Sequence, residues 1–405
     1  MSARRALRVL HVVSSLAPRY GGPSQVCQEL SQELARRGAR VSIYTTDIDG
    51  PGALAVPLDR PVLADGVEIR YFPVQRPRPW VLSWPLARAL RRAIPGQDVV
   101  HVHSLYLFPS TVAAHLCRRA AVPYLVRPHG TLDPYLYRRH RARKWVYERL
   151  FERRNLDRAA AIHFTTEEEA ALAQPLRLRA PGVVVPPGVD LERFRPGCEA
   201  DARAAVEAAW PETRGRQLVL FLGRLNFKKG LDLLARAFGR LARARADVHL
   251  LLAGPDDDGY GAAVRGWLER EGAGGRATFT GMLVGAQKLA ALRSAAVFAL
   301  PSYSENFGVA VVEALACGVP VVISDRVNIW REVAAARAGR VVACDPEDLH
   351  EALAALLDDP GARAEMAARA RRLAVARFTW AAAGERMEEV YREIVDRRGA
   401  RLGAG

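Results

Sequence analysis

Long hydrophobic runs, paired cysteines and glycine-rich nucleotide motifs are all missing from this sequence of 405 residues. No run of 18 apolar residues occurs, which excludes a transmembrane helix. The five cysteines are scattered and form no C-x-x-C, which argues against a disulfide framework or a structural zinc site and fits a reducing cytosol. Neither G-x-G-x-x-G nor the P-loop pattern appears, so a dinucleotide dehydrogenase or a P-loop NTPase is disfavoured.

Lysine is also scarce, although the chain is strongly basic. It has 59 Lys and Arg against 44 Asp and Glu, but only four of the 59 are lysines. Residues 1–200 carry 30 basic and 18 acidic residues, whereas residues 201–405 carry 29 and 26. The asymmetry predicts that the first half meets an anionic partner, namely nucleic acid, anionic lipid or a phosphorylated substrate. A GC-rich genome is the alternative explanation for the total charge.

Half of the residues are hydrophobic and a quarter are charged, as in folded soluble proteins. A single core rarely exceeds roughly 250–300 residues, so two domains are expected. The first residues resemble a signal peptide, with Arg4 and Arg5 before a short apolar run. His11 interrupts that run, and a first β-strand is the preferred interpretation.

Short apolar runs rich in Val, Ile and Leu alternate with helix-like segments, which predicts two doubly wound α/β sheets. The expected strands are 7–13, 41–46, 67–74, 99–103, 123–127, 160–165 and 183–186 in the first half, and 217–222, 248–253, 277–281, 296–300, 320–324 and 340–343 in the second. A Pro- and Gly-rich stretch at 186–197 separates the series. We expect Rossmann-like domains at 1–195 and 196–378, followed by a C-terminal helix at 379–405.

Doubly wound sheets bind ligands at the carboxyl ends of their strands. Gly21 and Gly22 follow the first strand and precede a helix, so their backbone could approach an anion. Arg224 and Lys229 follow the first strand of the second half and could converge on a diphosphate without a metal. The alternatives are an ordinary turn and a solvated basic loop.

The segment 301–320 carries the most specific pattern. Glu305 precedes a helix, and Glu313 lies about two turns further along in apolar surroundings, where an acid needs a partner. Ribose hydroxyls could supply that partner, or backbone groups could satisfy the carboxylate.

These motifs together resemble the group 1 retaining glycosyltransferases, which have the GT-B fold of two Rossmann-like domains. The resemblance extends over nearly the whole chain. It rests on the Glu305–Glu313 spacing within 301–322, on the pairs Gly21-Gly22 and Gly223-Arg224, and on Lys229-Gly230, the histidine motifs 98–103 and 128–132, the domain-crossing segment 187–194 and the ending 378–380. In the domain-crossing segment Pro187 stands where the family usually has Asn.

The resemblance implies a role for each matching residue. Arg224 and Lys229 would neutralise the diphosphate of a UDP- or GDP-sugar, Glu313 would hold its ribose, and Gly21 and Gly22 would approach its phosphates. Glu305, with the backbone of Asn306, Phe307 and Gly308, would contact the transferred sugar. His129 would contact the sugar and organise the reacting centre, and His103 could line the acceptor site. Domain 1–195 would bind the acceptor and domain 196–378 the nucleotide-sugar, with the C-terminal helix packing back on the first domain.

Metal ligands and nucleic-acid modules are not indicated. Asp256, Asp257 and Asp258 are interpreted as a solvated turn. We expect His101 and His103, which alternate on a strand, to face opposite sides of the sheet, with His101 in the core, so that they do not chelate one ion. The basic run 137–154 is either a helix at an anionic membrane surface or a surface helix that buries Trp145, Tyr147 and Leu150.

The sequence thus predicts a metal-independent hexosyltransferase with no cofactor other than its donor substrate. It would act with retention on a lipid-linked or saccharide acceptor, in cell-surface polysaccharide, lipopolysaccharide or glycolipid synthesis. We expect it in the cytoplasm, either free or peripheral on the inner face of the plasma membrane, and without a nucleic-acid partner. The alternatives are another GT-B enzyme, such as a nucleotide-sugar epimerase, and a non-catalytic scaffold of this fold.

Overall fold

The computed structural model describes residues 5–137, 147–257 and 259–403. The chain forms two compact units, Met1–Gly188 with Trp380–Gly405, and Val189–Thr379. The first boundary lies before the predicted limit at 195, because Val189 donates its N–H to the carbonyl of Phe378 (2.9 Å) and Phe194 packs in the core of the second unit. Each unit has an α/β fold built on one main sheet, as the alternation of apolar runs with helix-like segments predicted.

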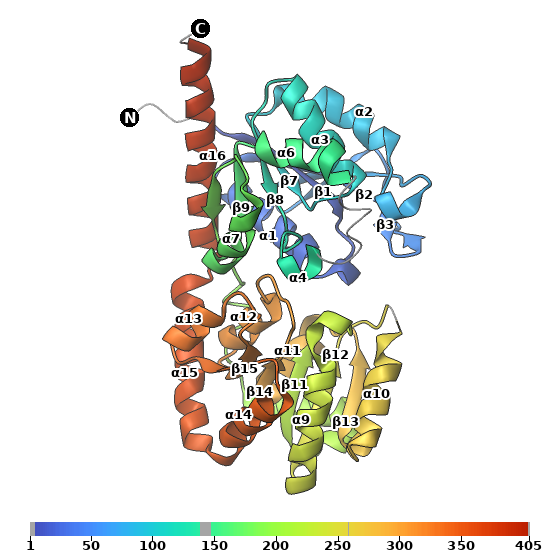
Figure 1. The fold of residues 1–405 in the computed structure, drawn as a ribbon, viewed down its shortest axis with the longest axis vertical. Coiled ribbons are helices and arrows are strands. Elements are labelled where there is room, and N and C mark those ends of the chain that lie inside the picture. Colours follow the sequence, from blue (N-terminus) through green and yellow to red (C-terminus); the bar gives the residue numbers. More distant parts are fainter. Residues whose placement is uncertain (1–4, 138–146, 258, 404–405) are drawn as a thin grey trace. The chain divides into compact units, whose positions relative to one another are not determined.

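The first unit is built on an eight-stranded sheet in the order β10-β9-β8-β7-β1-β2-β6-β5, in which β5 alone is antiparallel to its neighbour. The labelled strands β9, β8, β7, β1 and β2 follow this order across Figure 1. Its strands are β1 (Arg8–Ser15), β2 (Arg40–Thr46), β5 (Pro61–Ala64), β6 (Val67–Phe72), β7 (Val99–His103), β8 (Tyr124–Arg127), β9 (Ala161–Phe164) and β10 (Gly182–Val184). A short hairpin, β3 (Ile48–Asp49) and β4 (Gly52–Ala53), follows β2. The central strands β7, β8 and β9 are buried along their whole length, as expected for parallel strands covered by helices on both faces.

Helices of the first unit cover this sheet. They are α1 (Gly22–Arg36), α2 (Trp84–Ala93), α3 (Phe108–Arg119), α4 (Pro134–Tyr137), α6 (Arg153–Asp157), α7 (Glu167–Ala173) and α16 (Trp380–Gly403), with a π-helical turn at Glu148–Glu152 and 3₁₀ turns at Pro18–Tyr20, Arg78–Trp80, Ile94–Gly96 and Gln174–Leu176. The C-terminal α16 packs beside α1, where Arg37 Nε lies 3.0 Å from Glu388 Oε2 (Figure 1).

The second unit is built on an all-parallel sheet in the order β13-β12-β11-β14-β15-β16. Its strands are β11 (Gln217–Leu222), β12 (Val248–Ala253), β13 (Ala277–Gly281), β14 (Ala295–Leu300), β15 (Val321–Ser324) and β16 (Gly339–Val342). Its helices are α8 (Glu199–Ala209), α9 (Leu231–Ala244), α10 (Tyr260–Arg270), α11 (Gly285–Ser294), α12 (Val309–Ala316), α13 (Trp330–Ala335), α14 (Pro346–Asp358) and α15 (Pro360–Arg377), with 3₁₀ turns at Pro211–Thr213, Phe227–Lys229 and Gly274–Arg276.

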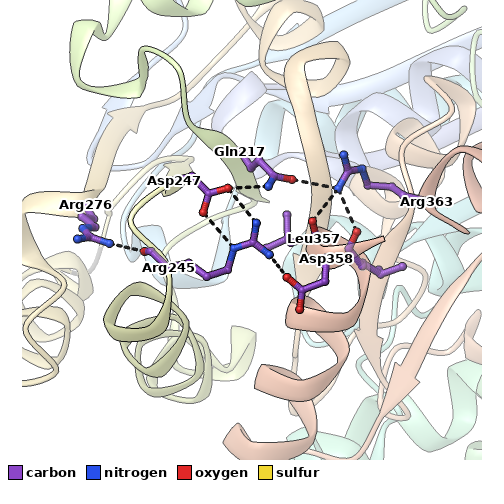
Figure 2. Close-up of polar contacts among 8 residues, drawn as sticks. Gln217, Arg245, Asp247, Arg276, Leu357, Asp358 and Arg363 are labelled. Carbon is purple, nitrogen blue, oxygen red and sulfur yellow. Dashed lines mark hydrogen bonds and ion pairs between the residues drawn. The ribbon is translucent and has the colours of Figure 1, made fainter. Parts of the chain in front are cut away.

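A polar network joins several elements of the second unit at the amino ends of its strands (Figure 2). Asp247, just before β12, accepts hydrogen bonds from Arg245 Nη2 and Gln217 Nε2, both at 2.8 Å. Arg245 also bonds Asp358 at the end of α14, and Arg363 on α15 donates to Gln217 at 3.0 Å. Ligands of such sheets bind at the carboxyl ends, so we assign this network a structural role.

In the part of the chain that the structure describes, no helix is both long and apolar enough to cross a membrane.

Candidate functional site

The loops after β11 and β14 lie against each other at the carboxyl edge of the second sheet. Gly230 has φ +65°, and a Cβ there would lie 1.9 Å from the carbonyl oxygen of Pro301, so only glycine fits. Tyr303 donates its N–H to the carbonyl of Lys228 (2.8 Å), and its hydroxyl donates to Asp232 Oδ2 (2.8 Å). These contacts hold the two loops together, and with them the predicted site residues Lys229 and Glu305.

Lys229 and Glu305 form an ion pair in this place. Their side chains are only 13% and 15% exposed. Burial alone would raise the pKa of the Glu305 carboxyl, but the charges of Lys229, Lys228 and Arg224 outweigh it, so the net effect is a lowered pKa. Glu305 is therefore ionised at neutral pH among three cations, and the group as a whole has an excess of positive charge.

The helix α12 begins at Val309, a short loop after Glu305. Gly308 is its N-cap with φ +78°, and the backbone of 305 pairs with the 326–328 loop through hydrogen bonds of 3.0 Å. The Phe307 side chain is buried and packs edge-on against Phe378, with ring centroids 5.5 Å apart, so only its backbone remains for a ligand. The first N–H groups of a helix have no partner within the helix, which makes this end suitable for an anion or a hydroxyl oxygen.

Glu313 lies further along α12 and is 1% exposed. Lys288 on α11 supplies its partner: Nζ lies 2.6 Å from Glu313 Oε1. Lys288 Nζ also lies 5.4 Å from the centre of the Phe194 ring. The sequence showed that this acid needs a partner but not that a lysine provides one.

In the first unit, Gly21 and Gly22 lie where the sequence predicted, at the start of α1 after β1. Gly21 has φ +65° and donates its own N–H to the carbonyl of Pro18 (2.9 Å). An anion at this helix would therefore be bound by N–H groups beginning with that of Gly22.

Four buried histidines lie on three parallel strands of the first sheet. His11 is on β1, His101 and His103 on β7, and His163 on β9. The expectation that His101 and His103 face opposite sides was wrong, because residues two apart on a strand point the same way. Their rings stack with centroids 4.6 Å apart. His101 is in the core, as predicted, and bonds Tyr391 Oη on α16 at 2.7 Å.

His129 follows β8 and is half-buried, with φ +52°. This backbone conformation is uncommon for residues other than glycine and is found preferentially at functional sites. His129 Nε2 lies 3.0 Å from Nδ1 of His103. His103 itself is 1% exposed, so the structure places it behind His129 rather than at the surface.

A metal could be held by His11, Cys27 and His103, whose ligand atoms all lie within 4.8 Å of one another. Two features oppose a cation here. Burial raises the pKa of the Cys27 thiol to about 12. The guanidinium of Arg127 is fully buried and close enough to affect all four buried histidines, and burial lowers its own pKa to about 10.

Two predicted features fall partly outside the described residues. Within the basic run 137–154, residues 138–146 are not described, and Trp145 is among them. The described Tyr147 bonds Thr111 Oγ1 at 2.7 Å, and Phe151 is 46% exposed. In the aspartate run, Asp258 is not described, and Asp256 Oδ1 accepts the N–H of Gly261 at 3.0 Å.

Sequence reasoning missed Lys288, Arg127, His11, His163 and Tyr391. Polar residues within otherwise apolar strands were the available signal for His11, His163 and Arg127. Lys288 was conspicuous as one of only four lysines in an arginine-rich chain. Nothing in the pattern of α16 distinguished Tyr391, whose role depends on contact with a strand 290 residues away.

Comparison with solved structures defines the fold class. Sucrose-phosphate synthase from Thermosynechococcus elongatus superposes with a TM-score of 0.79 at 22% identity, covering 96% of this chain and 99% of that one. HepE from Anabaena, solved with UDP and glucose, gives 0.77 at 18% identity over 96% and 100%. These neighbours and the two α/β sheet units define a GT-B fold, as predicted.

The chain belongs to the group 1 glycosyltransferases. The family profile "Glycosyl transferases group 1" matches residues 203–373, and "Glycosyltransferase Family 4" matches residues 20–193. A curated relative, D-inositol 3-phosphate glycosyltransferase 2 of Catenulispora acidiphila, is 30% identical over 94% of this chain and 92% of its own length. The resemblance inferred from the sequence motifs is thereby confirmed.

Proposed function

We propose that this glycosyltransferase moves a hexosyl group from a UDP- or GDP-sugar to an acceptor hydroxyl with retention of configuration and without an essential metal. The supporting observation is the group formed by Lys229, Arg224 and Glu305 beside the start of α12. A departing nucleotide diphosphate gains negative charge, and fixed cations and helix N-termini stabilise that charge. HepE, solved with UDP, has the same fold, which supports a uridine nucleotide as the first donor to test.

Donor binding tests this assignment directly. Calorimetry with UDP- and GDP-sugars should show binding to the wild type and loss of binding in Lys229→Ala and Glu313→Ala. A matched control is Arg265→Ala, whose guanidinium lies 3.8 Å above the Phe279 ring on the second unit, away from these loops in sequence. Unchanged nucleotide-sugar affinity in both site variants would overturn the assignment.

The acceptor is proposed to carry negative charge. The excess of basic residues in the first 200 supports this, and so do the relatives named as inositol 3-phosphate glycosyltransferases. The two acceptor classes are a lipid-linked diphosphate, as in cell-surface polysaccharide, lipopolysaccharide or glycolipid synthesis, and a soluble phosphorylated polyol. Turnover of UDP-glucose with a polyprenyl-diphosphate sugar and with inositol 3-phosphate distinguishes them. Donor conversion without any acceptor would instead indicate an epimerase, and an absence of nucleotide release with every acceptor would favour a scaffold.

A cytoplasmic site of action, at an anionic membrane surface, is proposed for the lipid-linked case. The first unit exposes Trp80 (47%) and Trp84 (55%) close in sequence to Arg78, Arg88 and Arg91. Such aromatic and basic side chains favour anionic lipid interfaces. Co-sedimentation with phosphatidylglycerol vesicles should fall in the Trp80→Ser/Trp84→Ser variant and remain unchanged in Val375→Ser, an exposed apolar control on the second unit. Equal sedimentation of all three proteins would contradict membrane contact.

A further inference from the structure

Three imidazoles form a continuous chain that ends at His129. His11 Nδ1 lies 3.0 Å from His103 Nε2, and His103 Nδ1 lies 3.0 Å from His129 Nε2. Burial lowers the pKa of each ring, that of His11 to about 3, so all three are neutral at pH 7. A neutral imidazole has one N–H and one acceptor nitrogen, so the chain can run in only two directions.

A second histidine chain in the same unit shows how one end sets the direction. His163 Nε2 lies 2.9 Å from the carbonyl oxygen of Val185, which can only accept, so His163 has its proton on Nε2. His163 Nδ1 then accepts from His101 Nε2 (3.2 Å), and His101 Nδ1 accepts from the hydroxyl of Tyr391 (2.7 Å). The Val185 carbonyl at the end of this second chain therefore determines the tautomers of both His163 and His101.

The chain that ends at His129 is controlled from the His11 end. His11 Nε2 is buried and has no hydrogen-bond partner among the described residues. The buried Arg127 guanidinium lowers the pKa of His11, after desolvation. If His11 carried its proton on Nε2, an unpaired N–H dipole would be buried in the field of that cation. With the proton on Nδ1, the N–H is hydrogen-bonded to His103, and no N–H of His11 is left buried without an acceptor.

We propose that His11 and His103 are positioning residues that hold His129 with its proton on Nδ1. His11 Nδ1–H donates to His103 Nε2, His103 Nδ1–H donates to His129 Nε2, and His129 presents Nδ1–H at the carboxyl edge of the first sheet. His129 is then a hydrogen-bond donor to a substrate oxygen and not a general base. The catalytic consequence rests on the proposed contact of His129 with the transferred sugar, whereas the tautomer itself does not.

The tautomer can be measured on the full chain without any substrate. In protein labelled with ¹⁵N-histidine, the ¹⁵N chemical shifts and one-bond N–H couplings of each ring identify the protonated nitrogen, and the His129→Gln variant assigns the signals of His129. We expect Nδ1–H for His11, His103 and His129, and Nε2–H for His101 and His163. A proton on Nε2 of His129 in the wild type would overturn the proposal.

Two substitutions of similar shape at position 11 test the direction of the hydrogen bonds along the chain. His11→Asp should reverse it, and His11→Asn should keep it. The amide of His11→Asn can donate its NH₂ to His103, which keeps the wild-type direction. The carboxylate of His11→Asp can only accept, with its charge offset by Arg127. His103 must then donate from Nε2 and accept at Nδ1, so His129 keeps its proton on Nε2 and presents a bare Nδ1.

The kinetic expectation follows from that reversal. His11→Asp should show the Nε2–H tautomer at His129. Its kcat should be lower by roughly 100- to 1,000-fold with donor affinity unchanged, as for loss of one fixed donor. His11→Asn should remain within a few-fold of the wild type. An unchanged kcat in His11→Asp with a reversed tautomer would overturn the catalytic consequence. If no transfer activity exists, the proposed function fails while the NMR spectra still decide the tautomer.

Metal analysis gives a separate outcome. The contrary result would be stoichiometric zinc or copper in the purified wild type that is lost in Cys27→Ser and retained in Cys117→Ser. His11 Nδ1 and His103 Nε2, which face each other, would then both be metal ligands. That result would overturn the hydrogen-bonded chain. Cys117 is the matched control because it is a buried cysteine of the same unit on α3.

Discussion

Lys288 Nζ lies 2.6 Å from Oε1 of Glu313, a carboxylate that is only 1% exposed in the apolar helix α12. The pair joins α11 to α12 within the second unit. A ribose hydroxyl at Glu313 would therefore share the carboxylate with Lys288. The pair gives Lys288 a role in the proposed donor site that the sequence did not assign to it.

Removal of Lys288 alone should destabilise the second unit. Lys288→Met leaves the buried Glu313 carboxylate without its cation, at a cost of about 3 kcal/mol. The double variant Lys288→Met/Glu313→Leu should recover most of that loss, because both charges are removed. Urea unfolding of the single and double variants measures the coupling, and Gln287→Met, an exposed position on the same helix, is the control. Equal stability of Lys288→Met and wild type would contradict this account.

The predicted strands agree with the structure because parallel strands buried on both faces have continuous apolar sequences. The runs at 99–103, 217–222 and 248–253 coincide with the buried strands β7, β11 and β12. The edge strand β5 was missed because its residues Pro61–Ala64 are exposed and half-buried in turn, and because proline is disfavoured within strands.

Site residues were predictable where they stand in loops that follow strands. Glu305 and Lys229 follow β14 and β11, and parallel strands bring their carboxyl ends to one edge. Pairings across the sheet were not predictable. The positions of His101 and His103 on one face follow from the strand period, but their partners His163 and Tyr391 are set by strand order and by the packing of α16.

Loss of the Tyr391 hydroxyl should weaken the attachment of α16 to the first sheet. In Tyr391→Phe, Nδ1 of the buried His101 loses its donor at an expected cost of about 1–3 kcal/mol. Thermal and urea unfolding measure this effect, and hydrogen exchange should increase most in α16. Tyr135→Phe, an exposed position of the same unit, serves as the control. Unaltered stability and exchange would mean that this hydrogen bond is not formed.

The network at Asp247 should contribute a small, salt-dependent stability. Hydrogen bonds from Arg245 and Gln217 lower the pKa of Asp247 (Figure 2). The stabilisation is therefore present above the unfolded pKa near 3.8 and is lost as the pH falls through the lower folded value. Since the side chain is 47% exposed, we expect Asp247→Asn to cost less than about 1 kcal/mol at pH 7. Calorimetry at low and high salt compares Asp247→Asn with the control Glu351→Gln. A loss of stability in Asp247→Asn that is the same at low and high salt would contradict the ionic origin.

Glu152 should make the first unit less stable as the pH rises. Its carboxylate is 1% exposed, and burial raises its pKa to about 7 from 4.5, although Tyr106 N–H and Thr111 Oγ1 donate to it at 3.2 and 3.1 Å. Between these two pKa values the folded state binds the proton that the unfolded state has released. The free energy of unfolding therefore falls as the pH rises from about 4.5 to 7, on the order of 2–3 kcal/mol for this group.

The variant Glu152→Gln isolates that contribution, because the amide oxygen can still accept from Tyr106 and Thr111 while no charge develops. Urea unfolding at intervals between pH 4.5 and 8.5 should show a shallower decline in Glu152→Gln than in the wild type, so that the variant gains relative stability above pH 7. The exposed Glu167 on α7 gives the control Glu167→Gln, which should follow the wild-type curve. Parallel curves for Glu152→Gln and wild type would show that the Glu152 carboxyl has an ordinary pKa in the folded protein.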